Sequence, residues 1–210
     1  MINNIKKLLL EHISDNSIKY FFLLLCFGAG IAAGALFISA LPPEKGDELM
    51  QVISSFATGI SDGEARTAET FRLSMVNNLR SIAMLYICGL SVYFIPLVYL
   101  HMLAKGFIIG FTVGFMSLFF GGKGFLFVIV SVLPQSIILL PSLMIMSVVS
   151  VNYAIEKSKA SRHGLLRGDS RRMLLRFTYS TGGVCVLIFA SALIDAFVIP
   201  VFVQGISGLF

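Results

Sequence analysis

Five long stretches of the chain carry no charged residue, and this feature limits the possible folds more than any other. They cover residues 20–41, 81–100, 106–122, 124–155 and 177–194. A bilayer core of about 30 Å is crossed by roughly 20 mostly apolar helical residues. Because Asp, Glu, Lys and Arg are costly in that core, charge-free blocks of this length indicate membrane-spanning helices.

The competing interpretation is a soluble protein with a large buried core, and the composition excludes it. Hydrophobic residues make up 57% of the 210 residues and charged residues 13%. A soluble domain of this length needs more charge than that to cover its surface.

We therefore predict an all-α fold: a polytopic membrane protein with five transmembrane helices, forming a single integral membrane domain over residues 1–210. The spans are expected at about 19–41, 81–101, 106–121, 125–150 and 177–199. The third run is short, so the sequence leaves open whether it crosses the membrane or re-enters. These spans leave no room for a separate soluble catalytic domain.

The basic residues indicate an orientation. With five helices and a cytoplasmic N-terminus, 11 Lys and Arg residues lie inside and 5 lie outside, which follows the positive-inside rule. The loop 42–80 and the C-terminus are then outside, and a basic loop at 154–176 is cytoplasmic. No aromatic residue interrupts the charges between positions 156 and 176. Nucleic-acid bases would find no stacking platform there, so anionic membrane lipid is the expected partner.

The outside loop 42–80 shows two amphipathic helical patterns. Apolar residues recur at helical spacing over 49–60 and again over 68–79, with a turn at 61–63 between them. We predict a helical hairpin between the first two spans, lying on the outer membrane surface or over the span ends. Phe56, Phe71 and Met75 are candidate partner-docking residues, but they would equally serve to cap the protein's own bundle.

Small residues four apart mark close helix packing, because they let two backbones approach in lipid. Gly30 and Gly34 form one such pair, and Gly106, Gly110 and Gly114 form a longer ridge. The sequence leaves open whether the ridge packs within the chain or against a second copy in a homo-oligomer.

Polar and helix-breaking residues interrupt two of the apolar runs. Pro134, Gln135 and Pro141 lie in the fourth, where proline frees a carbonyl and bends the helix. A broken helix with a polar side chain also occurs in transporter sites, although a kinked structural helix is the interpretation we favour. Asp195 is the acid of the last run, near its outer end, where a polar cap suits it better than a proton relay.

Patterns typical of enzymes are missing. The chain has no His-Glu-x-x-His zinc motif and no phosphate-binding loop. Its three cysteines lie singly in different apolar runs, without the spacing of metal ligands. We therefore predict no catalytic residues, no metal and no cofactor, and expect the protein not to be an enzyme.

Several of these segments together resemble the stage II sporulation protein M family of endospore-forming bacteria, over nearly the whole chain. The segments are 105–115 with the glycine ridge, 130–141 with its Pro-Gln and second Pro, Ser61-Asp62-Gly63, 193–196 with Asp195, and 200–202. The glycine ridge and the spacing from Pro134-Gln135 to Pro141 are the most specific of them.

The resemblance implies a five-span, non-enzymatic scaffold in the mother-cell membrane that acts when this cell engulfs the forespore. By this resemblance it recruits and holds two peptidoglycan-degrading partners, stage II sporulation proteins D and P. The alternative is a small transporter or channel subunit built around the kinked fourth span. A repeat-based transporter would show internal symmetry, and none is visible.

The orientation gives a first prediction. In a background without the native cysteines, Ser61→Cys is expected to react with a membrane-impermeant thiol reagent added to intact cells, and Ser161→Cys to react only after lysis. The physical reason is the excess of Lys and Arg in segments assigned to the inside. The reverse pattern of labelling would overturn the orientation.

Overall fold

The computed structural model describes residues 11–40, 42, 63–162 and 167–207. Its long helices are α2 (Ser17–Ser39), α4 (Gly63–Gly89), α5 (Ile95–Arg162) and α6 (Arg167–Ser207), with a short 3₁₀ turn, η2 (Val92–Phe94), before α5. No β-strand occurs among the described residues, so the all-α prediction is confirmed.

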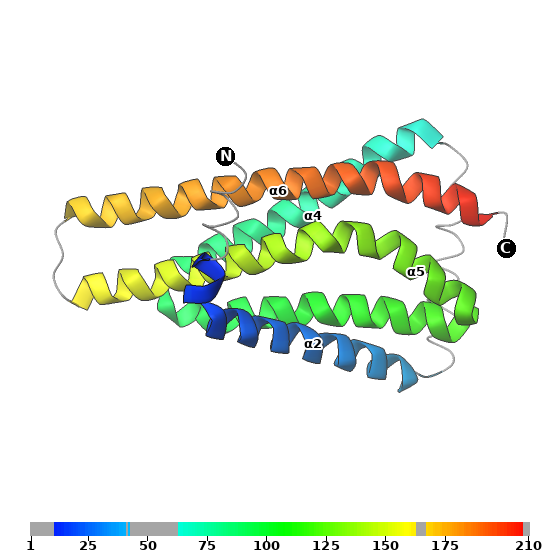
Figure 1. Cartoon of the computed structure of the whole chain (residues 1–210), viewed down its shortest axis with the longest axis horizontal. Helices are drawn as coiled ribbons and strands as arrows, with labels where there is room; N and C mark the ends of the chain where they lie inside the picture. Colours follow the sequence, from blue (N-terminus) through cyan, green and yellow to red (C-terminus); the bar gives the residue numbers. More distant parts are fainter. Residues whose placement is uncertain (1–10, 41, 43–62, 163–166, 208–210) are drawn as a thin grey trace.

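Helix α5 consists of two arms that run in opposite directions. Its backbone leaves the helical region at Gly121, where φ is 60° and ψ is −143°. L-residues with a side chain avoid this region, and glycine enters it without steric penalty. The chain therefore reverses at Gly121, and Figure 1 shows the two arms lying side by side as one hairpin. We call residues 95–120 the first arm and residues 122–162 the second arm.

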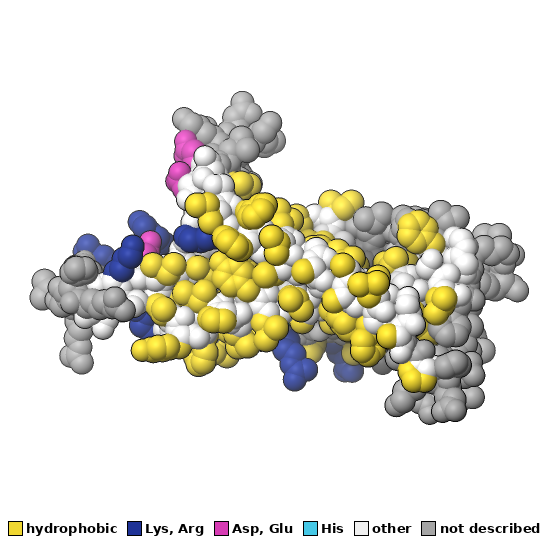
Figure 2. Space-filling view, turned by 90° about the horizontal axis from the view of Figure 1, so that it is seen from below, with side chains coloured by type: hydrophobic (Ala, Val, Ile, Leu, Met, Phe, Trp, Pro, Cys, Tyr) yellow, Lys and Arg dark blue, Asp and Glu magenta, His cyan; other side chains and the backbone are white. Residues whose placement is uncertain are grey.

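The helices form one elongated bundle; α2, the two arms of α5 and α6 follow its long axis (Figure 1). Consecutive segments alternate in direction, from α2 through α4 and the two arms of α5 to α6. Many basic side chains gather at one end, which we call the basic end; Figure 2 shows dark blue side chains there and others farther along the bundle. The last turns of α5, with Lys157 and Lys159, and the first turns of α6, with Arg171, Arg172 and Arg176, lie at this end, and Lys19 of α2 bonds to Asn152 of α5 near it (Figure 1).

Four described segments are long and apolar enough to cross a membrane: Ser17–Ser39, Val92–Leu118, Ser136–Ser161 and Arg171–Leu193. Their outward faces are apolar, with Phe21, Leu36 and Ile108 between 59% and 70% exposed. Figure 2 shows such side chains covering the length of one face. A hydrocarbon solvent suits such a surface, and the chain is accordingly a membrane protein.

The helix boundaries differ from the spans expected at 81–101 and 106–121. Helix α4 ends at Gly89, Ser91 is extended, and α5 begins at Ile95. Pro96 explains the start of α5, since proline favours the first turn of a helix, where its missing N–H is not needed. Nothing near Lys105 ends the helix, so the first arm passes through the position at which the sequence suggested a loop.

The outside hairpin also differs from the expectation. Residues 43–62, which hold its first half and Phe56, lie outside the described residues. The second half belongs to α4, which continues without a break from Gly63 to Gly89. Figure 1 shows α4 crossing the bundle obliquely beside α6. Helix α4 is not among the four candidate spans, so the five-span count is not established.

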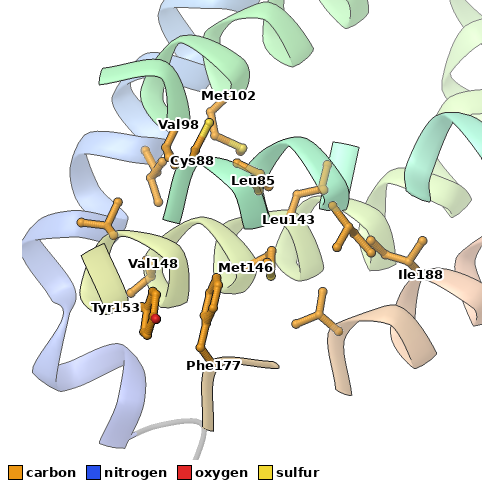
Figure 3. Packing of buried hydrophobic residues seen from close by; sticks show 14 residues of the cluster. Leu85, Cys88, Val98, Met102, Leu143, Met146, Val148, Tyr153, Phe177 and Ile188 are labelled. Atoms are coloured by element: carbon orange, nitrogen blue, oxygen red, sulfur yellow. The ribbon is translucent and has the colours of Figure 1, made fainter. Parts of the chain in front are cut away.

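The interior is filled by side chains from all the long helices. Leu85 of α4, Met102 of the first arm, and Leu143 and Met146 of the second arm are each 0% exposed. Figure 3 shows these side chains meeting between the helices, with Ile188 of α6 at the edge of the cluster. This packed centre holds α4 and α6 against the α5 hairpin.

Gly121 provides a test of the fold. Gly121→Ala is expected to destabilise the purified protein by about 1–2 kcal/mol, the cost of placing a Cβ at positive φ. The measurement is thermal unfolding in detergent. Gly122→Ala is the matched control, because Gly122 is the next residue, is exposed and has open space around it. Equal melting temperatures for the two variants would contradict this account of the reversal.

Candidate functional site

Glycines bring α2 and the first arm of α5 into direct backbone contact. A Cβ at Gly30 or Gly34 would lie closer than 3.0 Å to the backbone of Leu103 or Phe107. In return, a Cβ at Gly106 or Gly110 would clash with the backbone of α2, at Phe27 and Ile31 respectively. Real Cβ atoms essentially never come so near, so these four positions accept glycine alone without a shift of the helices.

This contact, which we call the glycine seam, lies within one chain. Gly114 continues the line with more room, since its Cβ would lie 3.3 Å from Cα of Ala35. The sequence left open whether the ridge packs inside the chain or against another copy, and the structure places α2 on it. In lipid, this kind of close approach replaces the hydrophobic drive that holds soluble helices together.

Hydrogen bonds join the helices at the basic end. The ammonium group of Lys19 donates to Oδ1 of Asn16 at 2.9 Å and to Oδ1 of Asn152 in the second arm of α5. Lys157 donates to the carbonyl oxygen of Leu90 at 2.9 Å, next to the turn after α4. Both lysines thus connect the end of the second arm to a neighbouring segment.

Two aromatic contacts show how α4 lies along α6. Near the basic end, the ring of Phe177 stacks between Tyr86 and Tyr153, with centroid separations of 4.7 and 4.4 Å. Farther along, Phe71 meets Phe189 edge to face at 5.8 Å. Phe177 and Phe189 are 12 residues apart within one candidate span, a rise of about 18 Å. The part of α4 between its two contacts therefore runs beside the candidate span Arg171–Leu193 of α6.

A bilayer positioned by that candidate span of α6 would place Arg80 inside the membrane layer. Arg80 lies between Phe71 and Tyr86 on α4, and its side chain is exposed. The charge pattern of the sequence predicts it at the edge of the outside loop instead. Arginine in that loop would be solvated by water, whereas at this depth its charge faces lipid unless another group covers it.

Two more titratable residues lie inside the first arm of α5. His101 and Lys105 fall within the candidate span Val92–Leu118, one helical turn apart, and both side chains are half-buried. The spans expected from the sequence put His101 at a span end and Lys105 in a cytoplasmic loop. A signal could have shown otherwise: the expected span 106–121 has 16 residues, fewer than the roughly 17–25 that a crossing helix needs.

An apolar groove opens beside Arg80. It has a volume of about 330 Å³ and runs between the C-terminal half of α4 and the start of α5. Its lining residues are Arg80, Ala83, Met84, Ile87 and Cys88 on α4, with Phe94 and Leu97 across from them. The groove is at the lower end of the volumes that hold small molecules in proteins.

The candidate docking residues take different places. Phe71 packs on Phe189, so its ring covers the protein's own α6. Met75 is half-buried on the same helix. Phe56 lies outside the described residues. The structure thus supports a role in the bundle for Phe71 and leaves docking at Phe56 a prediction.

The proline positions of the fourth run lie in the second arm of α5. The backbone keeps helical angles through Pro134 and Pro141, and the departure from them within α5 is at Gly121. Pro141 is exposed. Asp195 belongs to α6, and its side chain, like that of Gln135, is outside the described ones. Among the described residues, no three His, Cys, Asp or Glu side chains come together to hold a metal ion.

Comparison with known proteins adds one result. Residues 23–200 match the family model described as stage II sporulation protein M. The match reaches from α2 into the last quarter of α6. No curated protein sequence and no solved structure matches the chain.

The glycine seam gives a direct test. Gly110→Leu is expected to lower the free energy of unfolding by about 1–3 kcal/mol, because the added side chain forces two backbones apart. Gly182→Leu is the matched control, since Gly182 is an exposed helical glycine at which an added Cβ would meet nothing within 4 Å. Accumulation in membranes and melting in detergent measure the effect. The seam is not essential if both variants behave alike.

Proposed function

Because the chain belongs to the stage II sporulation protein M family, we propose that it is a non-enzymatic membrane scaffold acting when the mother cell engulfs the forespore. The family match, which covers residues 23–200, is the observation that carries this proposal. Membership makes the chain a sporulation membrane protein. The scaffold role, the stage and the location in the engulfing membrane are the proposed refinement.

The proposed partners are the peptidoglycan-degrading stage II sporulation proteins D and P, as the family resemblance implies. In this proposal those proteins cleave the wall and this chain determines where they act. The family is not a known enzyme family, which supports a role in location and assembly. With the N-terminus in the cytoplasm, the ends of α2 and α6 away from the basic end face the wall.

The packing supports a scaffold because it makes a stiff bundle with free outer faces. The glycine seam joins two spans backbone to backbone, and the buried cluster joins α4 and α6 to the α5 hairpin. Large apolar side chains remain on the outside, including Leu73 and Val76 of α4, at 57% and 60% exposure. Such faces can receive the membrane anchors of other proteins.

One observation favours the alternative, a small transporter or channel subunit. His101 and Lys105 are titratable groups within a span, and intramembrane residues of this kind mark ion pathways in pumps and transporters. The interior argues against a pathway, since Leu85, Met102, Leu143 and Met146 fill the space between the helices and are 0% exposed. The groove beside Arg80 opens on the flank of this packed centre. We therefore prefer the scaffold.

The test combines genetics and purification in the spore-forming source. Deleting the gene is expected to arrest sporulating cells before engulfment is complete, with vegetative growth unchanged. The tagged chain, solubilised from membranes of sporulating cells, is expected to co-purify with the two wall-degrading proteins. A tagged, unrelated membrane protein of similar size is the control. Normal engulfment in the deletion strain, or purification of the chain without either partner, would overturn the proposal.

A further inference from the structure

Arg80, His101 and Lys105 share one flank of the bundle, at the junction of α4 with the first arm of α5. On α5, the positions Leu97, His101, Lys105 and Ile108 follow one another at intervals of three or four residues, so they form a single helix face, and Phe94 of η2 precedes them by the same spacing. Phe94 and Leu97 line the groove together with Arg80. We call the three basic residues with the groove the basic flank.

The packing of α4 on α5 places the charges at similar depth. Figure 3 shows Cys88 and Leu85 of α4 beside Val98 and Met102 of α5, in antiparallel order. Arg80 lies five residues beyond Leu85, and Lys105 lies three residues beyond Met102, both going away from the basic end. At 1.5 Å per residue these steps are about 7.5 and 4.5 Å, which differ by about 3 Å. The arginine and the lysine are therefore nearly level.

The three basic groups lack partners among the described residues. Arg80 and Lys105 form no hydrogen bond or ion pair there, and Nε2 of His101 is buried without a hydrogen-bond partner. The described spans contribute no acid that reaches this level. Charged side chains at such depth are rare; those that occur face the bundle interior or a water-filled cavity, pair with another charge or with backbone carbonyls, or reach the interface from a helix end.

We propose that the basic flank is a docking site for a transmembrane helix of another protein, which carries a carboxylate near the middle of its span. The apolar side of that helix packs into the groove beside Ile87 and Leu97. Its carboxylate accepts charge-assisted hydrogen bonds from the exposed Arg80 and the half-buried Lys105, which gives both charges a partner. This inference deepens the proposed scaffold function, on which it rests, by assigning a place and a chemistry to partner binding.

The order in which apolar and basic residues follow one another from the membrane surface inward favours a helix over an anionic phospholipid as the occupant of the groove. The apolar residues Ile87 and Phe94 lie nearest the turn after α4, at the membrane boundary, whereas Arg80 and Lys105 lie deeper. A phospholipid of that leaflet has the opposite order, with its phosphate at the boundary and its chains deeper. A helix that crosses the layer can present apolar residues first and a carboxylate farther in.

A second copy of this chain does not supply the carboxylate. Its acid within an apolar helix is Asp195, which is 18 residues beyond Phe177 along α6, or about 27 Å. Tyr86 of α4 stacks on Phe177. Arg80 is 6 residues from Tyr86 along α4, so it lies at most about 9 Å deeper than that stack. Two copies inserted in the same orientation would leave these groups about 18 Å apart in depth, so the occupant is a different protein.

The experiment uses the full chain in phosphatidylcholine bilayers and a synthetic transmembrane peptide of Leu and Ala with one central Asp. Association is measured by energy transfer between labels on the two molecules. The central-Asp peptide is expected to bind at least about tenfold more tightly than the same peptide with Leu at that position. This is the gain in affinity expected from one charge-assisted pair in lipid. A peptide with its Asp moved to the last turn is expected to lose this advantage.

Variants of the chain connect the effect to the basic flank. Arg80→Gln combined with Lys105→Gln is expected to abolish the preference for Asp, and Arg72→Gln to preserve it. Arg72 is the matched control because it is also an exposed arginine of α4 and does not line the groove. A charge exchange, Arg80→Glu combined with Lys105→Gln and a central Lys in the peptide, is expected to restore tight binding. Melting in detergent checks that every variant is folded.

Two outcomes would overturn the inference. One is that the unmodified chain binds the Asp and Leu peptides equally well, or that the double variant binds the Asp peptide as tightly as the unmodified chain does. The other is loss of the Asp preference when phosphatidylglycerol replaces phosphatidylcholine, which would make an anionic phospholipid the occupant. The docking site can fail while the scaffold function holds. If the double variant still supports engulfment and still binds both partners, the docking site is wrong and the scaffold proposal stands.

Discussion

Direct backbone contact between α2 and the first arm of α5 is the interaction on which the remaining structure depends. Hydrocarbon solvates a leucine as well as another helix does, so association in a membrane requires close packing. Glycine at positions 30, 34, 106 and 110 makes that packing possible. It aligns α2 with the α5 hairpin, and this alignment lets Lys19 reach Asn152 in the second arm. The arms then offer one surface to α4 and α6.

The second constraint is the cost of charge in hydrocarbon, and α4 is where it matters most. This helix carries an exposed Arg80 in the groove that it forms with the start of α5, and its contacts at Tyr86 and Phe71 hold it along a candidate span. A lone bundle in lipid would leave that charge uncovered. The proposed scaffold function would resolve the conflict, since partner proteins would complete the surface. The same reasoning connects the proposed function with the proposed docking site.

Much of the architecture could be predicted from residue patterns because membrane insertion depends on local composition. Charge-free stretches of about 20 residues identified membrane helices around α2, the second arm and α6, and the glycine spacing identified the residues of the seam. The errors came where a single charge was taken as a boundary. Lys105 suggested a loop, but no turn or cap residue stands beside it, and the helix continues through it from Pro96 to Gly121. Likewise the polar pattern of 64–79 suggested a surface helix, although it is continuous with the apolar residues before Gly89.

By itself, the sequence determined the all-helical membrane class, the family and the small residues available for close packing, because these follow from composition and spacing along the chain. Only the tertiary structure decided that the glycine ridge meets α2 of the same chain, that Phe71 packs on α6, and that Arg80 and Lys105 reach similar depth on one flank. These outcomes depend on which helix faces lie opposite one another. Residues far apart in the chain determine that pairing, through packing that no local pattern contains.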